Sequence, residues 1–171
     1  MYNVIDFGGT MQETYWKKLT QFKYALCYFD AHLARCVKID RSIKIFTAIA
    51  SSAAIAAWAT WQGLSFWWGL IIVISQVVMA VNEFLPYKKR IKELSNIKAA
   101  LTPVYNDMEK EWFYVSNGEM TEDQINKRCY HFVQRWNSID DGFFVDDALP
   151  QIKKCKEYAE TAKNTYFETN F

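Results

Sequence analysis

The sequence predicts an all-α protein in which a two-helix transmembrane hairpin continues into a cytoplasmic helical bundle. Three observations lead to this class. No charged residue occurs in the 38 positions from Ile45 to Asn82. Apolar residues recur with heptad spacing on both sides of that window. The 171 residues include only 6 Gly and 3 Pro, which disfavours a loop-rich or many-stranded fold.

The overall composition excludes two other classes of protein. With 51% hydrophobic and 23% charged residues, the chain is too apolar to be intrinsically disordered. Its net charge of +1 lacks the basic excess that a non-specific nucleic-acid binder usually carries. The length suffices for one ordinary domain and is too short for two large ones.

The uncharged window is long enough for two membrane-spanning helices. About 20 apolar residues span a hydrocarbon core of about 30 Å. A turn signal at Gln62-Gly63 divides the window into predicted spans at 43–61 and 64–85. The alternative is a buried hairpin of a soluble protein, but a core helix normally keeps a polar face toward solvent. The predicted organisation is a cytoplasmic helix at 1–42, the hairpin at 43–85 and a cytoplasmic helical domain at 86–171.

Positive charge flanks the hairpin on both sides and is absent from its turn. By the positive-inside rule, both termini then face the cytoplasm and the turn faces outward. Tryptophans around the turn fit an aromatic belt at the outer interface. The cations are Arg35, Lys38, Arg41 and Lys44 before the hairpin and Lys88, Lys89, Arg90 and Lys92 after it. The tryptophans are Trp58, Trp61, Trp67 and Trp68.

Both predicted spans carry residues suited to line a pore. Thr47, Ser51 and Ala54, spaced 4 and 3, give the first span one narrow and mildly polar face. In the second span, Gln76 and Glu83 are seven positions apart and share a face. Gln76 either forms an interhelical hydrogen bond or presents its amide to a pore. Because small residues permit close helix packing, we expect the first span at the centre of an assembly, unless Gln76 and Glu83 indicate the reverse order.

Charged residues at the ends of the window mark a predicted cytoplasmic mouth. Lys44 and Glu83 end the window on opposite arms of the hairpin, and the first seam reaches the mouth through Asp40. Lys44 and Glu83 either pair with each other or contribute to rings of like charge from several subunits. Such rings would set ion preference, so we predict Asp40, Lys44 and Glu83 as gate residues.

The remainder of the chain is predicted to be helical. Two heptad seams of about 28 to 30 residues, each about 42 to 45 Å long, have matched lengths and predict an antiparallel pair, with a kink at Pro103. Thr121 and Gln124 have the spacing of a capping box and begin a third helix. A last helix is predicted at roughly 147–166. The first seam is Tyr15, Leu19, Phe22, Leu26, Phe29, Leu33, Cys36, Asp40 and Ile43. The second is Ile91, Leu94, Lys98, Leu101, Tyr105, Met108, Trp112 and Val115, widened by Ile97 and Val104. The stripe of the third helix is Ile125, Cys129, Phe132, Trp136 and Ile139.

No motif in the chain supports catalysis or metal binding. It contains no P-loop, nucleophile elbow or H-E-x-x-H motif, so we expect no enzyme activity and no cofactor. His32 with Cys36, and Cys129 with His131, lack the usual zinc spacing. The acidic loop at 140–147 lacks EF-hand spacing. The cysteines, which form no C-x-x-C pair and are expected as free thiols, are Cys27, Cys36, Cys129 and Cys155.

Basic and aromatic residues alternate in the stretch RCYHFVQRW, from Arg128 to Trp136. Arginine neutralises phosphate and aromatic rings stack on bases, which indicates an anionic ligand. The alternative is structural, because aromatic residues at this spacing commonly form a core. The predicted ligand-binding residues are Lys88, Lys89, Arg128, Arg135 and Trp136.

The stretch from about Phe29 to Ile125 has the layout of a short membrane hairpin continued into cytoplasmic helices. Its segments run from FDAHLARCVKIDRSIKIFTAIASSAAI through VNEFLPYKKRIKELSNIKAAL to EKEWFYVSNGEMTEDQI. In layout and texture they resemble the SLATT family of bacterial two-transmembrane effectors, which are often encoded beside nucleotidyltransferases. The resemblance implies a pore-forming effector of antiphage defence in the inner membrane.

The resemblance also implies control from the cytoplasm by a nucleotide or short oligonucleotide made by a partner nucleotidyltransferase, as in Hailong-type systems, with no role for duplex nucleic acid. Two helices per subunit cannot enclose an aqueous path, so a pore requires a homo-oligomer. We expect a tetramer, with a pentamer next. The alternative function is a non-conducting membrane anchor that recruits a partner protein through its cytoplasmic helices.

Overall fold

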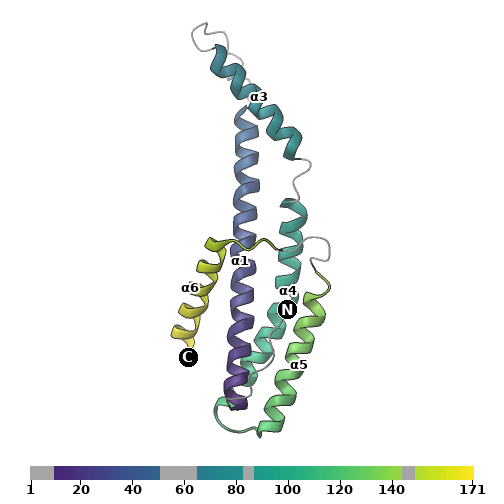
Figure 1. Ribbon diagram of the computed structural model, residues 1–171, viewed down its shortest axis with the longest axis vertical. Helices are drawn as coiled ribbons and strands as arrows, with labels where there is room; N and C mark the ends of the chain where they lie inside the picture. The colour runs from purple at the N-terminus through teal and green to yellow at the C-terminus, as the bar shows by residue number, and fades with distance from the viewer. Residues whose placement is uncertain (1–9, 51–64, 83–86, 144–148) are drawn as a thin grey trace. The chain divides into compact units, whose positions relative to one another are not determined.

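The computed structural model describes residues 10–50, 65–82, 87–143 and 149–171 (Figure 1). In these ranges the chain forms five helices and no strand, which confirms the predicted all-α class. In chain order the helices are α1 (Met11–Ala50), α3 (Ser65–Asn82), α4 (Tyr87–Ser116), α5 (Glu122–Asp140) and α6 (Lys153–Asn170).

The chain divides into two compact units. Unit 1 comprises residues 1–32 and 93–171, and unit 2 comprises residues 33–92. Two helices therefore contribute to both units. Unit 1 takes the first part of α1 and most of α4, together with α5 and α6. Unit 2 takes the rest of α1, the start of α4, and α3.

In unit 1, α1 and α4 pack as the antiparallel pair that the two seams predict. The Tyr15 hydroxyl donates to the Met108 carbonyl oxygen at 2.8 Å, and Lys98 Nζ pairs with Asp30 Oδ1 at 2.5 Å. A residue later in α1 therefore contacts a residue earlier in α4, which shows that the two helices run antiparallel. The seam residues that are buried are Tyr15, Leu19, Phe22, Leu26 and Phe29 on α1 and Leu94, Ile97, Leu101, Val104, Tyr105, Met108 and Val115 on α4.

Helix α4 continues through Pro103. Proline has no backbone N–H, so the Ala99 carbonyl loses its helical donor, and an interior proline costs about 3 kcal/mol. Leu101 and Val104 on either side of Pro103 are buried. Packing of this face against α1 therefore offsets the cost and lets the helix continue through Pro103.

Helix α4 ends in a Schellman motif. Gly118 adopts a left-handed φ of 71°, which glycine tolerates without a Cβ clash. The Gly118 N–H donates to the Val115 carbonyl at 3.2 Å, and the Glu119 N–H donates to the Tyr114 carbonyl at 3.0 Å. These two bonds satisfy carbonyl groups that a helix end otherwise leaves unpaired.

Helix α5 begins at the predicted capping box. The Thr121 hydroxyl accepts from the Gln124 N–H at 3.4 Å, and the Gln124 side chain accepts from the Thr121 N–H at 2.9 Å. The predicted apolar stripe lies against the rest of unit 1, where the Trp136 ring stacks on Phe22 with 4.0 Å between centroids. Its buried members are Ile125, Cys129, Phe132 and Trp136.

Helix α6 begins later than the sequence predicts. We expected a helix from about residue 147, but Leu149 to Ile152 have no regular structure and α6 begins at Lys153. The reason is Pro150, whose ring disfavours the helical conformation of the preceding Leu149. The helix also extends to Asn170, beyond the predicted end at residue 166.

Aromatic contacts hold the end of α6 against α1. The Trp16 ring lies 4.9 Å from the Phe167 ring and 5.5 Å from the Phe171 ring, both in edge-to-face geometry. Cys155 and Ala159 are the buried residues of α6. Small buried side chains and aromatic contacts at its end therefore contribute to the attachment of α6.

The described part of unit 2 exposes many large apolar side chains. On α3 the exposed set covers all sides of the helix, and Phe66 reaches 75% exposure. Among the described side chains of α3, that of Ser75 is buried at 3% exposure, and its hydroxyl donates to the Ile72 carbonyl at 2.7 Å. The exposed apolar residues of α3 are Phe66, Trp67, Leu70, Ile71, Ile72, Val73, Ile74 and Val77, and those near the end of α1 are Val37, Ile45, Phe46 and Ile49.

The predicted membrane spans are described only in part. The span at 43–61 is helical as far as Ala50, and the span at 64–85 is helical over Ser65–Asn82. The predicted turn at Gln62-Gly63 lies outside the described residues. In the ranges that the structure covers, none of the helices combines the length and the apolar character that a bilayer crossing requires.

Candidate functional site

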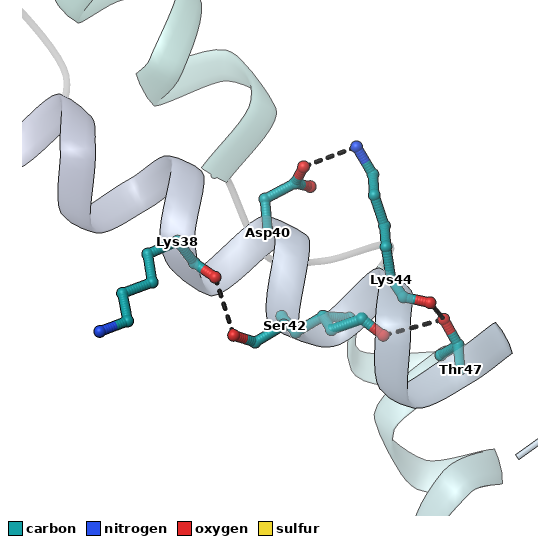
Figure 2. A network of polar contacts seen from close by, with 6 residues as sticks. Lys38, Asp40, Ser42, Lys44 and Thr47 are labelled. Carbon is teal, nitrogen blue, oxygen red and sulfur yellow. Dashed lines mark hydrogen bonds and ion pairs between the residues drawn. The ribbon is translucent and has the colours of Figure 1, made fainter. Parts of the chain in front are cut away.

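The predicted mouth residues of α1 form a local polar network (Figure 2). Lys44 Nζ pairs with Asp40 Oδ2 at 2.6 Å, one helical turn away, with side-chain exposures of 62% and 16%. The Ser42 hydroxyl donates to the Lys38 carbonyl at 2.9 Å. Glu83, the other expected partner of Lys44, lies outside the described residues. Within the described chain, the positive charge of Lys44 is therefore balanced on its own helix.

Of the predicted pore residues, the structure describes two. The Thr47 hydroxyl lies 2.9 Å from the Ile43 carbonyl oxygen and 3.0 Å from that of Lys44, so it is engaged with its own backbone (Figure 2). Gln76 is exposed on α3. Ser51 and Ala54 lie outside the described residues, as Glu83 does.

The predicted ligand-binding residues divide between the two units. Lys88 and Lys89 are exposed at the start of α4 in unit 2. Arg128 and Arg135 lie on α5 in unit 1. Each basic pair is therefore described within its own unit.

Both α5 arginines face carboxylates of α4. Arg128 Nη1 lies 3.5 Å from Glu111 Oε1, and Arg135 Nη1 lies 3.1 Å from Asp107 Oδ2. Each arginine is about half exposed, with side-chain exposures of 58% and 41%. An anionic ligand at this face would compete with an acidic side chain for each guanidinium.

Trp136 lies in the core of unit 1. Its side chain is 6% exposed, and one ring face is covered by Phe22. An indole in this position stabilises the packing of α5 on α1 and has no open face on which a base could stack. The structural interpretation of the RCYHFVQRW stretch therefore applies to this residue.

A polar cluster in unit 1 joins three helices and was not predicted. Glu109 Oε1 on α4 accepts hydrogen bonds from the hydroxyls of Tyr105, at 2.7 Å, and Tyr166, at 2.6 Å. Lys23 Nζ on α1 lies 3.1 Å from the centroid of the Tyr166 ring and 4.8 Å from that of Tyr105. We call these four residues the Glu109 cluster. They connect α6 to both α1 and α4.

Burial controls the protonation of the Glu109 cluster. It lowers the pKa of Lys23, an effect that Cys27 and Glu109 oppose. Burial, and then the hydrogen bond to Glu109, raises the pKa of Tyr105. The same two causes raise the pKa of Tyr166 to about 12. Near neutral pH both tyrosines are therefore protonated donors, and the cluster is a structural joint.

The periodicity that identifies helix faces does not reveal the Glu109 cluster. Tyr105 belongs to the predicted seam, but Lys23 and Glu109 are ordinary charged residues in amphipathic helices. Tyr166 lies 57 positions from Glu109, and no local spacing relates them. Only the register of α6 against α4 brings the hydroxyl to the carboxylate.

The described residues hold no group of three or more His, Cys, Asp or Glu side chains that could bind a metal ion. His32 is buried on α1 and contacts the Tyr28 ring, with 4.6 Å between centroids. Cys27, Cys129 and Cys155 are buried thiols that form no disulfide. Burial raises the pKa of Cys27 and Cys129, which disfavours the reactive thiolate.

Comparison of the chain with known protein families, with curated proteins and with solved structures found no match.

Proposed function

We propose that the chain is an oligomeric, pore-forming membrane protein whose α1–α3 region enters the bilayer. One observation carries the proposal, namely the uncharged surface of α3, on which large apolar side chains are exposed on all sides. Water-exposed surfaces rarely carry a contiguous apolar area of this kind, and such areas mark protein or membrane contacts. The exposed Ile45, Phe46 and Ile49 extend this surface along the end of α1.

Helix α3 is slightly shorter than the hydrocarbon core of a bilayer, and a bilayer can accommodate such a difference. The 18 residues of α3 rise about 27 Å at 1.5 Å per residue, slightly less than a hydrocarbon core of about 30 Å. Short spans are accommodated by local thinning of the bilayer, by snorkelling of flanking residues or by oligomerisation. Lys88 and Lys89 are exposed just after the hairpin and are placed to snorkel.

The proposed assembly is a homo-oligomer, with a tetramer as the expected state, in the inner membrane with both termini cytoplasmic. The cationic flanks support this orientation. The resemblance to SLATT effectors supports a role in antiphage defence, with opening controlled by a nucleotide or short oligonucleotide. Unit 1 would be the sensing part, since its helices pack into a closed core that a membrane anchor alone would not need.

Membrane insertion and conduction are tested separately. Expressed in bacteria, the full chain should remain in the membrane fraction after alkaline carbonate extraction. Purified and reconstituted, it should pass ions across liposomes that carry a potential-sensitive dye. Recovery in the soluble fraction would refute the proposal. Stable insertion without flux, under all ligand conditions, would favour the non-conducting anchor.

The predicted mouth gives the conduction test a specific variant. Glu83→Gln should change ion selectivity while preserving assembly, because the neutral amide removes a proposed ring of carboxylates. Glu93→Gln on α4, outside the predicted spans, is the matched control. Equal selectivity of the Glu83 variant and the unmodified chain would remove Glu83 from the mouth.

The ligand test uses the α5 arginines. Binding of a fluorescent short oligodeoxynucleotide should weaken in a variant that carries Arg128→Ala and Arg135→Ala. Lys127→Ala is the matched control, because Lys127 lies on the same helix but pairs with Asp123 one turn away. Equal binding by the double variant and the control would exclude the α5 pair and leave Lys88 and Lys89 as the basic pair to test.

A further inference from the structure

Helices α5 and α6 have nearly equal lengths, 19 and 18 residues, but they begin differently. Helix α5 has the capping box of Thr121 and two acidic residues in its first turn, which the positive end of the helix dipole favours. Helix α6 follows Ile152, whose side chain cannot accept a hydrogen bond, and three of its first four residues are lysines. The sequence of α6 therefore stabilises its own helix less than the sequence of α5 does.

The two helices also bury different side chains. Those of α5 include the large apolar Phe132 and Trp136, whereas the buried side chains of α6 are the small Cys155 and Ala159. The larger Phe167 of α6 is only partly buried. Hydrophobic stabilisation scales with the apolar area that is removed from water, so less apolar burial holds α6 on unit 1 than holds α5.

Two hollows flank the attached side of α6. Ala159 is fully buried, and the side chains before and after it point about 100° to either side. Tyr158 lines a hollow of about 510 Å³, and Glu160 lines another of about 260 Å³ between α1 and α6. Tyr158 and Glu160 are both exposed, so water reaches α6 on both flanks.

The polar contacts of α6 can be exchanged for contacts with water. The Tyr166 hydroxyl donates to Glu109 at 2.6 Å, and the Tyr28 hydroxyl donates to the Pro150 carbonyl at 3.1 Å. The net contribution of such bonds is modest, because water replaces the partner when they break. The Tyr166 ring also covers Lys23 Nζ, and burial lowers the pKa of Lys23. Docking of α6 therefore removes water from an ammonium group, a cost that the cation–π contact offsets in part.

We propose that α6 is a releasable strap, which leaves α1 and α4 in one step while α1, α4 and α5 stay packed. Proteins open in cooperative units of different stability, and the start, the burial and the flanks of α6 all place it below α5. Release uncovers Lys23 and Glu109, so unit 1 can change its charged surface without unfolding. The inference does not rest on the proposed function, because these contacts all lie within unit 1 and their test needs no membrane.

Two native cysteines test the strap in the full chain. Cys155 lies on α6 and Cys129 on α5, and they are 5% and 7% exposed. The purified chain is treated with iodoacetamide, and mass spectrometry gives the labelling rate of each cysteine relative to its rate in the urea-unfolded chain. We expect Cys155 to be labelled at least tenfold faster than Cys129. A smaller ratio would overturn the proposal, because α6 would then open together with α5.

Urea distinguishes release of α6 from unfolding of the whole chain. Release of one helix exposes less surface than complete unfolding, and the effect of urea scales with the exposed surface. The logarithm of the Cys155 labelling rate should therefore rise with urea less than half as steeply as that of Cys129. Equal slopes would also overturn the proposal.

A substitution at the opposite end of α6 distinguishes release from fraying of its first turn. Phe167→Ala removes the ring beside Trp16 and should speed Cys155 labelling about threefold to tenfold, the range for one aromatic pair. Phe113→Ala on α4, at a position that is 62% exposed, is the matched control and should leave the rate unchanged. Equal Cys155 labelling in Phe167→Ala and the unmodified chain would refute the strap, because fraying of the first turn alone would then expose Cys155.

Discussion

The two units use similar apolar residues in opposite ways. In unit 1, Leu19, Leu101 and Met108 are fully buried between helices of the same chain. In unit 2, Ile72 and Val73 on α3 are 43% and 59% exposed. The hydrophobic effect favours burial of apolar surface. Unit 1 closes its core with its own helices, whereas the described part of unit 2 leaves these apolar side chains exposed.

The largest expected difference in the free energy of unfolding is between substitution of a buried residue of unit 1 and substitution of an exposed residue of unit 2. Leu101→Ala should lower the free energy of unfolding by about 2–5 kcal/mol, because it leaves a cavity in unit 1. Val73→Ala, at a position that is 59% exposed, should change it by about 0.5 kcal/mol or less in detergent. Urea unfolding of the solubilised protein, followed by circular dichroism, measures both. Equal losses would contradict the contrast.

The next largest effect on stability concerns the hydrogen bond between Tyr166 on α6 and Glu109 on α4. Tyr166→Phe keeps the ring beside Lys23 but removes the hydrogen bond to Glu109, and should cost about 1–2 kcal/mol. Tyr158→Phe on the same helix, 58% exposed, is the control and should be neutral. Tyr166→Phe should also speed proteolysis within α6. Unchanged stability together with unchanged proteolysis would show that the Glu109 cluster does not hold α6.

Alkaline pH should loosen unit 1 before it affects α3, which has no ionisable side chain. In the folded chain the pKa of Tyr166 is raised from 10.0 to about 12, and that of Tyr105 is also raised. The folded state therefore favours the neutral phenols. Their contribution is complete below pH 10 and is lost as the pH rises toward 12. Phenolate absorbance and circular dichroism, recorded together, should show a smaller loss of helix for Tyr166→Phe over this range.

The smallest effect concerns the ion pair on α1 in unit 2. Lys44→Ala should destabilise the protein by about 0.3–0.5 kcal/mol, because an exposed pair one helical turn apart contributes little. Lys38→Ala on the same helix is the control. A loss above about 1 kcal/mol at Lys44 would exceed the usual range for such a pair and would indicate a partner beyond Asp40.

Periodicity predicted the faces of the helices because each face is a local property. The seam positions from Tyr15 to Phe29 are buried as predicted, and the capping box at Thr121 and Gln124 is present. The start of α6 was predicted wrongly, although Pro150 is a local signal that could have corrected it. The antiparallel pairing of α1 and α4 was predicted from the matched lengths of the two heptad seams.

The sequence did not predict which side chains pair between neighbouring helices. Arg128 and Arg135 were selected for their charge, but their contacts with Glu111 and Asp107 depend on the register of α5 against α4. Side-chain packing along the whole interface sets such a register, and no short spacing encodes it. The Lys44–Asp40 pair is the opposite case, because its spacing of four residues is visible in the sequence.

The turn between α4 and α5 has a consequence for the order in which the chain acquires structure. Gly118 and Thr121 complete this turn with neighbouring groups only, so it can form as soon as it is synthesised. The partner of Gln12, by contrast, is the Val115 carbonyl, 103 residues later. At a synthesis rate of about 5–20 residues per second, roughly 5–20 s pass between the synthesis of Gln12 and that of Val115. Helix α1 is thus made first but cannot complete its long-range contacts until α4 has been made, whereas the turn between α4 and α5 needs only its neighbours.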